Sequence, residues 1–432
     1  MGIIWSKKHR TFHLFNNEIS YLIKVTDAGH LMHLYWGKRI YQNDLDYALN
    51  SRNYNNYLKE SVGLENMHLE QLPQEFPSFG SNDMRLPALM VDFPHGARTT
   101  DFKFESFEIL DGKPELEGLP STYSDRDNVK TLIVYLIDKF EGIRVALYYS
   151  IFDDYNAIAR SVKVINTNDE KVYIERIMSA TVDLSNFHGD MIQLSGFWAR
   201  ERFYERTPLR QGVQEIFSRK GSSSHELNPL LVLADQKADE HHGDVYAMNF
   251  VYSGNFEGSV EYDSNQIARM SMGINDFDFR WSLLPGDSFQ SPEVICVYSD
   301  GGLEKMSHTF HGLYANHLIR GKFKKALRPI LLNNWEATYF DFDEKNILDL
   351  AKEASDLGIE LFVLDDGWFG KRDSDNSSLG DWFVDERKLP SGLNSLAKNI
   401  NDMGMKFGLW FEPEMISPDS DLYRSHPDWC IG

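Results

Sequence analysis

The hydrophobic pattern of the chain changes once, close to residue 306. From about residue 12 to residue 298, apolar and polar side chains alternate in many short runs separated by turn residues, as at 131–137, 145–152, 161–165 and 172–178. Alternation with a period of two is typical of β-strands that bury one face, and this part of the chain shows almost no helical periodicity. We therefore predict a large antiparallel β-sandwich over residues 1–306.

A helical pattern follows the predicted sandwich. Residues 307–327 place Phe310, Leu313, Leu318 and Ile319 at roughly helical spacing, with basic residues near the end of the stretch. This spacing predicts a linker helix between the sandwich and the rest of the chain.

Residues 328–432 have a third pattern, in which short apolar runs alternate with helical stretches. The apolar runs lie at 330–332, 361–364 and 407–411, and the helical stretches lie at 344–357 and 393–403. Such alternation is typical of βα units with parallel strands. The first helix has clear ends, because Asp343 is a candidate N-cap and Gly358 follows its last turn.

Three parallel strands are too few to close a barrel, because a (β/α)8 barrel needs eight and occupies about 250 residues. The residues alone therefore leave two interpretations. The stretch is either an open three-stranded sheet or the front part of a longer protein.

Composition and charge exclude several classes of partner. The 432 residues carry a net charge of −21 and the pI is near 5.1, so the surface repels nucleic acid and anionic membranes. The first residues, MGIIWSKKHRTFHLF, lack the apolar stretch of a secretory signal, and no later run reaches the roughly 18 to 20 apolar residues of a membrane span. The two cysteines, Cys296 and Cys430, do not make a disulfide framework. We expect a cytoplasmic protein without a nucleic-acid or membrane partner.

Acidic and aromatic residues stand at the ends of the three predicted parallel strands. The second strand runs into Asp365 and Asp366, Trp335 follows the first strand, and Trp410 lies near the end of the third. The carboxyl ends of parallel strands meet at one edge of a sheet, where such folds bind their ligands. Carboxylates accept hydrogen bonds from hydroxyl groups, and flat rings cover the apolar C–H face of a sugar. We therefore predict a carbohydrate site.

The residues alone leave the roles within this site open. Asp365 and Asp366 can form a catalytic pair, a clamp on two hydroxyl groups or a solvated turn, and each tryptophan can instead pack in a core. A clamp suits adjacent carboxylates better than a position across a scissile bond, because a retaining glycosidase needs a separation of roughly 5 to 5.5 Å. Glu412 and Glu414 can be supporting anchors or acid/base groups. The polar loop at 369–388 can be a lid, a subsite wall or a surface excursion.

Four long segments resemble the bacterial α-galactosidases of glycoside hydrolase family 36. They are WARERFYERTPLRQGVQEIFSRKGSSSHELNP, LLNNWEATYFDF, LFVLDDGWFGKRDSDNSSLGDWFVDERKLPSGL and FGLWFEPEMISPDSDLYRSHPDW, and the resemblance runs through essentially the whole chain. It implies a multidomain β plus α/β protein: an N-terminal antiparallel β-supersandwich followed by the first three βα units of a (β/α)8 barrel. The complete enzymes of the family also have a small C-terminal β-domain and are commonly tetramers.

The resemblance also implies roles for the residues at the strand ends. Asp365 and Asp366 match an aspartate pair that binds the O4 and O6 hydroxyls of galactose, Trp335 matches a tryptophan that lines the sugar site, and Trp410 looks like a further wall of that pocket. The implied reaction is the retaining hydrolysis of terminal α-linked galactose in melibiose, raffinose and stachyose. No metal or organic cofactor is implied.

The family places its two catalytic aspartates later in the barrel. The nucleophile stands near the end of the fourth strand and the acid/base residue after the sixth, so both are expected beyond Gly432. We therefore expect no catalytic residue in these 432 residues, and we expect the chain to be inactive alone. Two alternatives stay open: a galactose-binding or inert fragment, and an α-N-acetylgalactosaminidase or galactosyl transferase of the same family.

Overall fold

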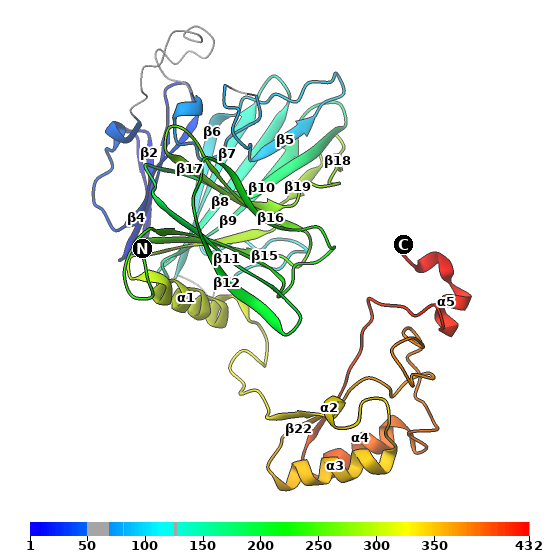
Figure 1. Ribbon diagram of the computed structural model, residues 1–432. Coiled ribbons are helices and arrows are strands. Elements are labelled where there is room, and N and C mark those ends of the chain that lie inside the picture. Colours follow the sequence, from blue (N-terminus) through cyan, green and yellow to red (C-terminus); the bar gives the residue numbers. More distant parts are fainter. Residues whose placement is uncertain (50–68, 81, 125–127, 432) are drawn as a thin grey trace. The chain divides into compact units, whose positions relative to one another are not determined.

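The computed structural model describes residues 1–49, 69–80, 82–124 and 128–431, and the chain divides into two compact units (Figure 1). The first unit is Met1–Lys324 and the second is Lys325–Gly432. Each unit has a hydrophobic core of its own. The border between them falls inside the stretch for which the sequence predicts a linker helix.

The first unit consists of three antiparallel sheets. The four-stranded sheet follows chain order, with β1 (Gly2–Ser6), β2 (Thr11–Phe15), β3 (Ile19–Val25) and β4 (Leu31–Lys38). The six-stranded sheet has the order β13 (Gly212–Ser218), β16 (Phe256–Tyr262), β17 (Ile267–Ile274), β10 (Val172–Ser185) and β18 (Trp281–Leu283), and β5 (Leu89–Asp92) also pairs with β10.

The ten-stranded sheet is the largest of the three. Its order is β12 (Arg200–Pro208), β11 (Gly189–Phe197), β14 (Leu227–Asp235), β15 (Val245–Val251), β20 (Glu293–Ser299), β9 (Ala157–Asn166), β8 (Ile143–Phe152), β7 (Val129–Asp138) and β6 (Lys103–Asp111), and β19 (Ser288–Gln290) also pairs with β9. Two short 3₁₀ helices, η1 (Asp46–Leu49) and η2 (Leu69–Gln71), complete the connections before β5. The prediction of a mostly antiparallel β architecture is confirmed.

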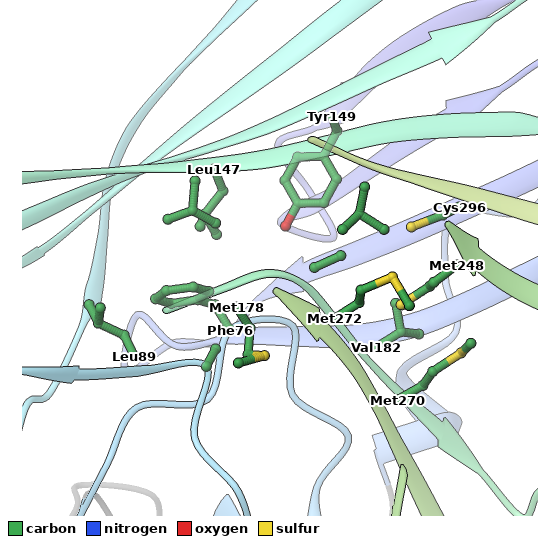
Figure 2. Close-up of a cluster of buried hydrophobic side chains, with 14 of the residues drawn as sticks. Phe76, Leu89, Leu147, Tyr149, Met178, Val182, Met248, Met270, Met272 and Cys296 are labelled. Atoms are coloured by element: carbon green, nitrogen blue, oxygen red, sulfur yellow. The ribbon is translucent and has the colours of Figure 1, made fainter. Parts of the chain in front are cut away.

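The main core lies between the ten-stranded and the six-stranded sheets. Figure 2 shows Tyr149 of β8, Met248 of β15 and Cys296 of β20 gathered with Met178 of β10 and Met272 of β17. Thioether side chains are flexible and polarizable, so they fill the irregular space between two twisted sheets. The alternation in the sequence arises here, because every second residue of these strands points into this core.

The helix after the sandwich differs from the prediction. α1 spans Gly302–Leu313 and continues as the π-helix η3 (Tyr314–Leu318), so the helix begins before residue 307 and ends well before residue 327. Its buried side chains, among them Met306 and Phe310, pack with residues of β15 and β20. The helix therefore belongs to the first unit, and the prediction of a linker helix over 307–327 is wrong.

The reason for the early end lies in residues 319–330. Ile319 has extended backbone torsions, and Gly321 has a φ of +74°, which an L-residue adopts only with strain. Apolar residues of this stretch also find little cover, since Leu327 and Ile330 are 96% and 60% exposed, so burial does not support a longer helix.

The second unit consists of a parallel sheet with helices, as predicted. The sheet order is β21 (Leu331–Asn333), β22 (Leu361–Leu364) and β23 (Lys406–Leu409). The helices are α2 (Trp335–Thr338), α3 (Glu344–Asp356), α4 (Gly392–Asp402), α5 (Asp421–Ser425) and the 3₁₀ helix η4 (Pro427–Trp429). The three predicted strands and the two predicted long helices are confirmed to within two residues at each end.

The long helices of this unit bury one face against the sheet. Ile347 and Ala351 of α3 and Ile400 of α4 form one core with Phe362 of β22. The predicted N-cap is confirmed: the Asp343 side chain accepts a hydrogen bond from the N–H of Asn346, whose own side chain accepts one from the Asp343 N–H. Among the described residues, no helix is long and apolar enough to cross a membrane.

Candidate functional site

The three parallel strands end side by side, and their register places the predicted site residues next to one another. Asn333 at the end of β21 pairs with Val363 of β22, and Leu364 at the end of β22 pairs with Leu409 of β23. The N–H of Trp410 donates to the carbonyl of Leu364 over 3.0 Å, which extends the ladder by one residue. The side chains that follow these strands therefore project from one edge of the sheet.

Asp365 is the half-buried carboxylate at this edge. Two asparagines hold it: Asn333, the last residue of β21, and Asn334, which follows the strand. Its N–H donates to Oδ1 of Asn334 over 2.8 Å, and its Oδ2 accepts from Nδ2 of Asn333. Oδ1 of Asp365 accepts from the N–H of Asp366 over 2.7 Å. Asn334 is completely buried, so this anchor does not depend on a mobile surface side chain.

Asp366 is buried and forms an ion pair with Arg372. Nε of Arg372 donates to Oδ1 over 2.9 Å and to Oδ2 over 3.1 Å, and Nη2 donates to Oδ2 over 2.8 Å. The N–H of Gly367 also donates to Oδ1 over 2.7 Å. The fork of the guanidinium matches the carboxylate and fixes its orientation. The two neighbouring aspartates thus have different partners, and only Asp366 is paired with a cation.

Arg372 and Lys388 also hold the loop that follows Gly367. Nη1 of Arg372 donates to the carbonyls of Asp375 and Ser377 over 2.8 and 2.7 Å. Nζ of Lys388 is buried and donates to three carbonyls, those of Phe340, Gly367 and Arg372, over 2.9, 3.0 and 3.0 Å. These bonds satisfy backbone oxygens that the irregular loop would otherwise leave unpaired.

Trp335 is the first residue of α2 and is tied to the same asparagine as Asp365. Its N–H donates to Oδ1 of Asn333 over 2.8 Å. Its half-buried ring meets the rings of Tyr339 and Phe340 edge to face, with centroids 5.1 and 5.0 Å apart. Asn333 therefore connects the first strand end to both a predicted clamp residue and a predicted ring of the site.

Trp410 lies at the opposite side of β22, in the core of the second unit. Its ring is nearly parallel to that of Phe369, at 18° with a centroid distance of 6.5 Å, and its carbonyl accepts from Nε1 of Trp368 over 3.1 Å. The ring is half-buried, so part of it packs in the core and part is open. From the sequence alone, the Trp410 ring can pack in a core or line a sugar site. Its geometry fits a ring that does both.

Glu412 is coupled electrostatically to the buried ion pair. Its burial and the nearby Glu414 raise the pKa of the Glu412 carboxyl; the opposing effect of Arg372 is smaller, and Asp366 raises it further. These couplings connect Glu412 to the site formed by Asp366 and Arg372. Glu414 is exposed.

The loop at 369–388 is anchored along its length. Phe369 bridges to Val384, and the Phe369 ring packs on Trp382 with centroids 4.4 Å apart. Asp381 is not a free carboxylate: both oxygens accept backbone N–H groups, from Asp421 and Leu422, each over 3.0 Å. This side chain caps the N-terminus of α5, which is a structural task.

Four residues of the site were not predicted from the sequence: Asn333, Asn334, Arg372 and Lys388. The Asn-Asn pair directly after an apolar strand was a usable signal, because amide side chains at the end of a parallel strand can bond to the end of the neighbouring strand. Arg372 and Lys388 gave no signal, because they stand in a loop rich in charges and their burial depends on how that loop folds. Among the described residues, no group of three His, Cys, Asp or Glu side chains is placed to hold a metal ion.

Comparisons with known proteins agree along the whole chain. The family model described as the glycosyl hydrolase family 36 N-terminal domain matches residues 29–284, and the model described as melibiase matches residues 288–432. The chain is 47% identical to the α-galactosidase AgaA of Geobacillus stearothermophilus, over 100% of its own length and 59% of that protein. It is 44% identical to the α-galactosidase Mel36A of Lactobacillus acidophilus, over 99% of its own length and 59% of that protein.

A solved structure supports the same likeness. The crystal structure of a variant of AgaA from G. stearothermophilus in complex with raffinose has a TM-score of 0.94 to this chain, at 47% identity. The match covers 98% of this chain and 59% of the other. The chain thus spans about 59% of the length of the relatives that it matches.

Proposed function

The chain belongs to glycoside hydrolase family 36, and on this premise we propose that it is the galactose-recognising part of a retaining α-galactosidase. The proposed substrates are oligosaccharides with a terminal α-linked galactose, such as melibiose, raffinose and stachyose. The observation that carries the proposal is the carboxylate pair Asp365 and Asp366, fixed at the strand ends by different partners. The expected enzyme needs no metal or organic cofactor.

We propose unequal shares of hydroxyl binding for the two carboxylates. A carboxylate has about four acceptor positions. Asp366 uses most of them on Arg372 and Gly367. Among the described residues, Oδ1 of Asp365 accepts one donor, from Asp366, and Oδ2 accepts one, from Asn333. Asp365 is also the more exposed of the two. It would therefore accept the hydroxyls of the sugar directly, while Asp366 adds one contact from a rigid position.

The rings of Trp335 and Trp410 would form the walls of the sugar site. Both are half-buried, and each is joined through a neighbouring strand end to Asp365. A ring held on one side by core packing presents its other face at little entropic cost. A clamp that accepts hydroxyls between two rings suits the C4 hydroxyl that distinguishes galactose from glucose.

The chemistry itself would need two further carboxylates. In the retaining mechanism one carboxylate attacks the anomeric carbon while a carboxylic acid protonates the leaving oxygen, and water then cleaves the galactosyl ester with the second group as base. Asp366 and Asp381 have structural partners, and Asp365 is assigned to hydroxyl binding. We therefore propose that the 432-residue chain binds galactose and does not hydrolyse galactosides by itself. The nucleophile and acid/base predicted beyond Gly432 lie outside the described residues.

Two measurements on the purified 432-residue chain test the proposal. Calorimetry with millimolar galactose should give heat that weakens about tenfold or more in Asp365→Asn, since hydrogen bonds to a charged group are lost. Asp349→Asn, on the exposed face of α3, is the matched control and should bind normally. Glucose should give much less heat than galactose. Absence of heat with galactose would contradict the assignment of the site.

The second measurement is hydrolysis of p-nitrophenyl α-galactoside, for which we expect no turnover. Turnover that disappears in Asp366→Asn would instead place the reacting carboxylates in this chain or in a second copy, with Glu412 and Glu414 as the first candidates. The N-acetyl-α-galactosaminide analogue, measured in parallel, separates the α-N-acetylgalactosaminidase alternative from the galactosidase.

We also propose that the complete protein is a cytoplasmic homotetramer. The cysteines support the compartment, since Cys296 is buried and Cys430 is exposed as free thiols, as suits a reducing environment. The tetramer rests on the resemblance to family 36 alone. Sedimentation equilibrium of the protein and fractionation of the cells that produce it test the two parts of this proposal.

A further inference from the structure

A groove of about 880 Å³ lies on the first unit, and no part of the strand-end site contributes to it. Its floor includes Tyr148 of β8 and Lys163 of β9, which lie on the same face of the ten-stranded sheet. Its walls come from the segment at 114–119, from residues 252–255 and from the loop at 275–281. The volume falls in the range of about 300–1,000 Å³ that is typical of sites for small molecules.

Aromatic rings from separate elements gather in this groove. Tyr148, Tyr252, Phe277, Trp281 and Phe289 all line it. Trp281 is 49% exposed and Phe277 is 59% exposed, and the Trp281 ring stands edge-on to Phe289 with centroids 5.1 Å apart. Single exposed aromatic residues are common on protein surfaces, but several rings around one concavity indicate a binding surface.

The groove also holds polar groups that are not used by the fold. The hydroxyls of Tyr148 and Tyr252, the carboxylate of Glu117 and the ammonium of Lys163 have no hydrogen-bond partner in the part of the chain that the structure describes. Together they offer both donors and acceptors. An apolar partner would leave these groups unpaired, at a cost for each.

The charge around the groove selects against anions. Glu115, Glu117 and Asp278 oppose the single cation Lys163 among the charged residues that line it. A phosphate or a polyanion would therefore be repelled. A neutral ligand with many hydroxyls fits both the unused polar groups and the flat rings.

The position of the Tyr252 ring depends on the glycine at residue 254. A Cβ on residue 254 would lie 2.5 to 2.8 Å from three atoms at the end of the Tyr252 side chain, so the ring keeps its present position only beside a glycine. The φ of Gly254 is not in the left-handed region, so the glycine there serves this close approach and not a turn. The groove thus depends on a specific small residue.

We propose that this groove is a second saccharide site, which binds neutral hexose oligosaccharides independently of the site at the strand ends. Trp281 and Phe277 at the rim cover the C–H face of a sugar ring. Tyr148, Tyr252, Glu117 and Lys163 exchange hydrogen bonds with its hydroxyls. The site has no catalytic role, and it goes beyond the galactosidase function proposed above.

Saturation-transfer NMR with raffinose tests this in the full 432-residue chain. Asp365→Asn, which should weaken the strand-end site about tenfold or more, serves as the background. In that background, transfer to raffinose should persist, and Trp281→Ala should lower it about fivefold or more, as expected for the loss of a ring platform. Trp198→Ala is the matched control, because Trp198 is 81% exposed and does not line the groove. It should leave the transfer unchanged.

Two further variants distinguish a loss of binding from a loss of folding. Gly254→Ala displaces the Tyr252 ring without removing it, and Glu117→Gln removes one exposed charge; both should weaken transfer while the circular dichroism spectrum and thermal unfolding stay as in the parent. Loss of all transfer in Asp365→Asn alone would overturn the second site and leave the strand-end site supported. The second site would also be overturned if Trp281→Ala left the transfer unchanged and lowered the sedimentation coefficient below that of the parent. That result would assign the groove to a contact with a second copy of the chain.

Discussion

At the scale of single residues, Arg372 makes two neighbouring aspartates different. Both follow the same strand, yet Arg372 takes up most of the acceptor positions of Asp366 and leaves those of Asp365 largely open. Rigid positioning of one carboxylate and access to the other are both needed for a site that must recognise an arrangement of hydroxyls. The difference does not appear in the sequence DDG, in which the two residues look equivalent.

Replacing Arg372 by Met should destabilise the second unit strongly. The change leaves the carboxylate of Asp366 buried without its cation, and breaking such a buried pair costs about 3–5 kcal/mol. Hydrogen exchange over residues 365–388 should accelerate in proportion, because the same side chain holds the Asp375 and Ser377 carbonyls. Lys352→Met breaks the exposed pair with Asp356 and is the control; it should change stability by about 1 kcal/mol at most. Equal effects of the two variants would contradict the assigned burial.

At the scale of elements, the sequence predicted the helices and strands whose ends carry local signals. Asp343 and Gly358 mark the two ends of α3, and the helix is found between them. The predicted bounds of the helix after the sandwich are wrong because Phe310 and Leu313 have the right spacing, but the helix ends at Leu318 and Gly321 has a positive φ. The spacing of apolar residues shows that a helix has an apolar face. Only the surface that packs against this face decides where the helix ends.

Asp343→Ala should loosen the first turn of α3. The change removes the hydrogen bond from the Asn346 N–H to Asp343 Oδ1, 2.8 Å long, and an N-cap of this kind is worth about 1 kcal/mol. Hydrogen exchange of the first turn should therefore rise by roughly fivefold. Asp343→Ser keeps a capping oxygen and should restore most of the protection. A rise of the same size in both variants would show that the cap is not what holds this turn.

At the scale of the whole molecule, the pairing of strands was beyond the sequence. Alternation predicted the strands of the sandwich, but it does not say that β9 pairs with β20, which lies more than a hundred residues later, or that β10 bridges to β17, β5 and β18. The same limit applied to the candidate site. Asp365, Asp366, Trp335 and Trp410 could be placed at one sheet edge, whereas the partners Arg372 and Lys388 depend on the course of a loop.

Acid should destabilise the first unit through its buried ion pairs. Burial alone would raise the pKa of Asp83, but Arg269 and Arg85 lower it more, so that the pKa in the folded protein lies below the ordinary value of 3.8. The unfolded chain therefore takes up a proton before the folded one does, and this contribution is complete above about pH 4 and is lost as the pH falls through the folded pKa. Urea unfolding between pH 7 and pH 3 measures it. Asp83→Asn should be less stable at pH 7 and should lose less stability on acidification; parallel pH profiles would contradict this assignment.

Brief digestion with trypsin should divide the chain between its two units. The stretch from Arg320 to Arg328 contains five basic residues, most of them exposed, and it lies between two separate cores. Mass spectrometry should find early cuts in this stretch and late cuts elsewhere in the described residues. Early cuts after Arg372, Arg387 or Lys388 in the 369–388 loop would contradict the anchoring seen there, because hydrogen bonds hold the side chains of these three of its four basic residues.

The hydrogen bond from Asn333 to Asp365 has a consequence for how this edge of the sheet can evolve. One asparagine on the first strand both orients the carboxylate of the second strand and receives the N–H of Trp335. A substitution of Asn333 or of Asp365 leaves the other residue without its hydrogen bond. A change of sugar preference through Asp365 alone would therefore also cost Asn333 its bond. The two positions are coupled by this hydrogen bond, and a designer who wishes to alter the ligand would do better to randomise both together.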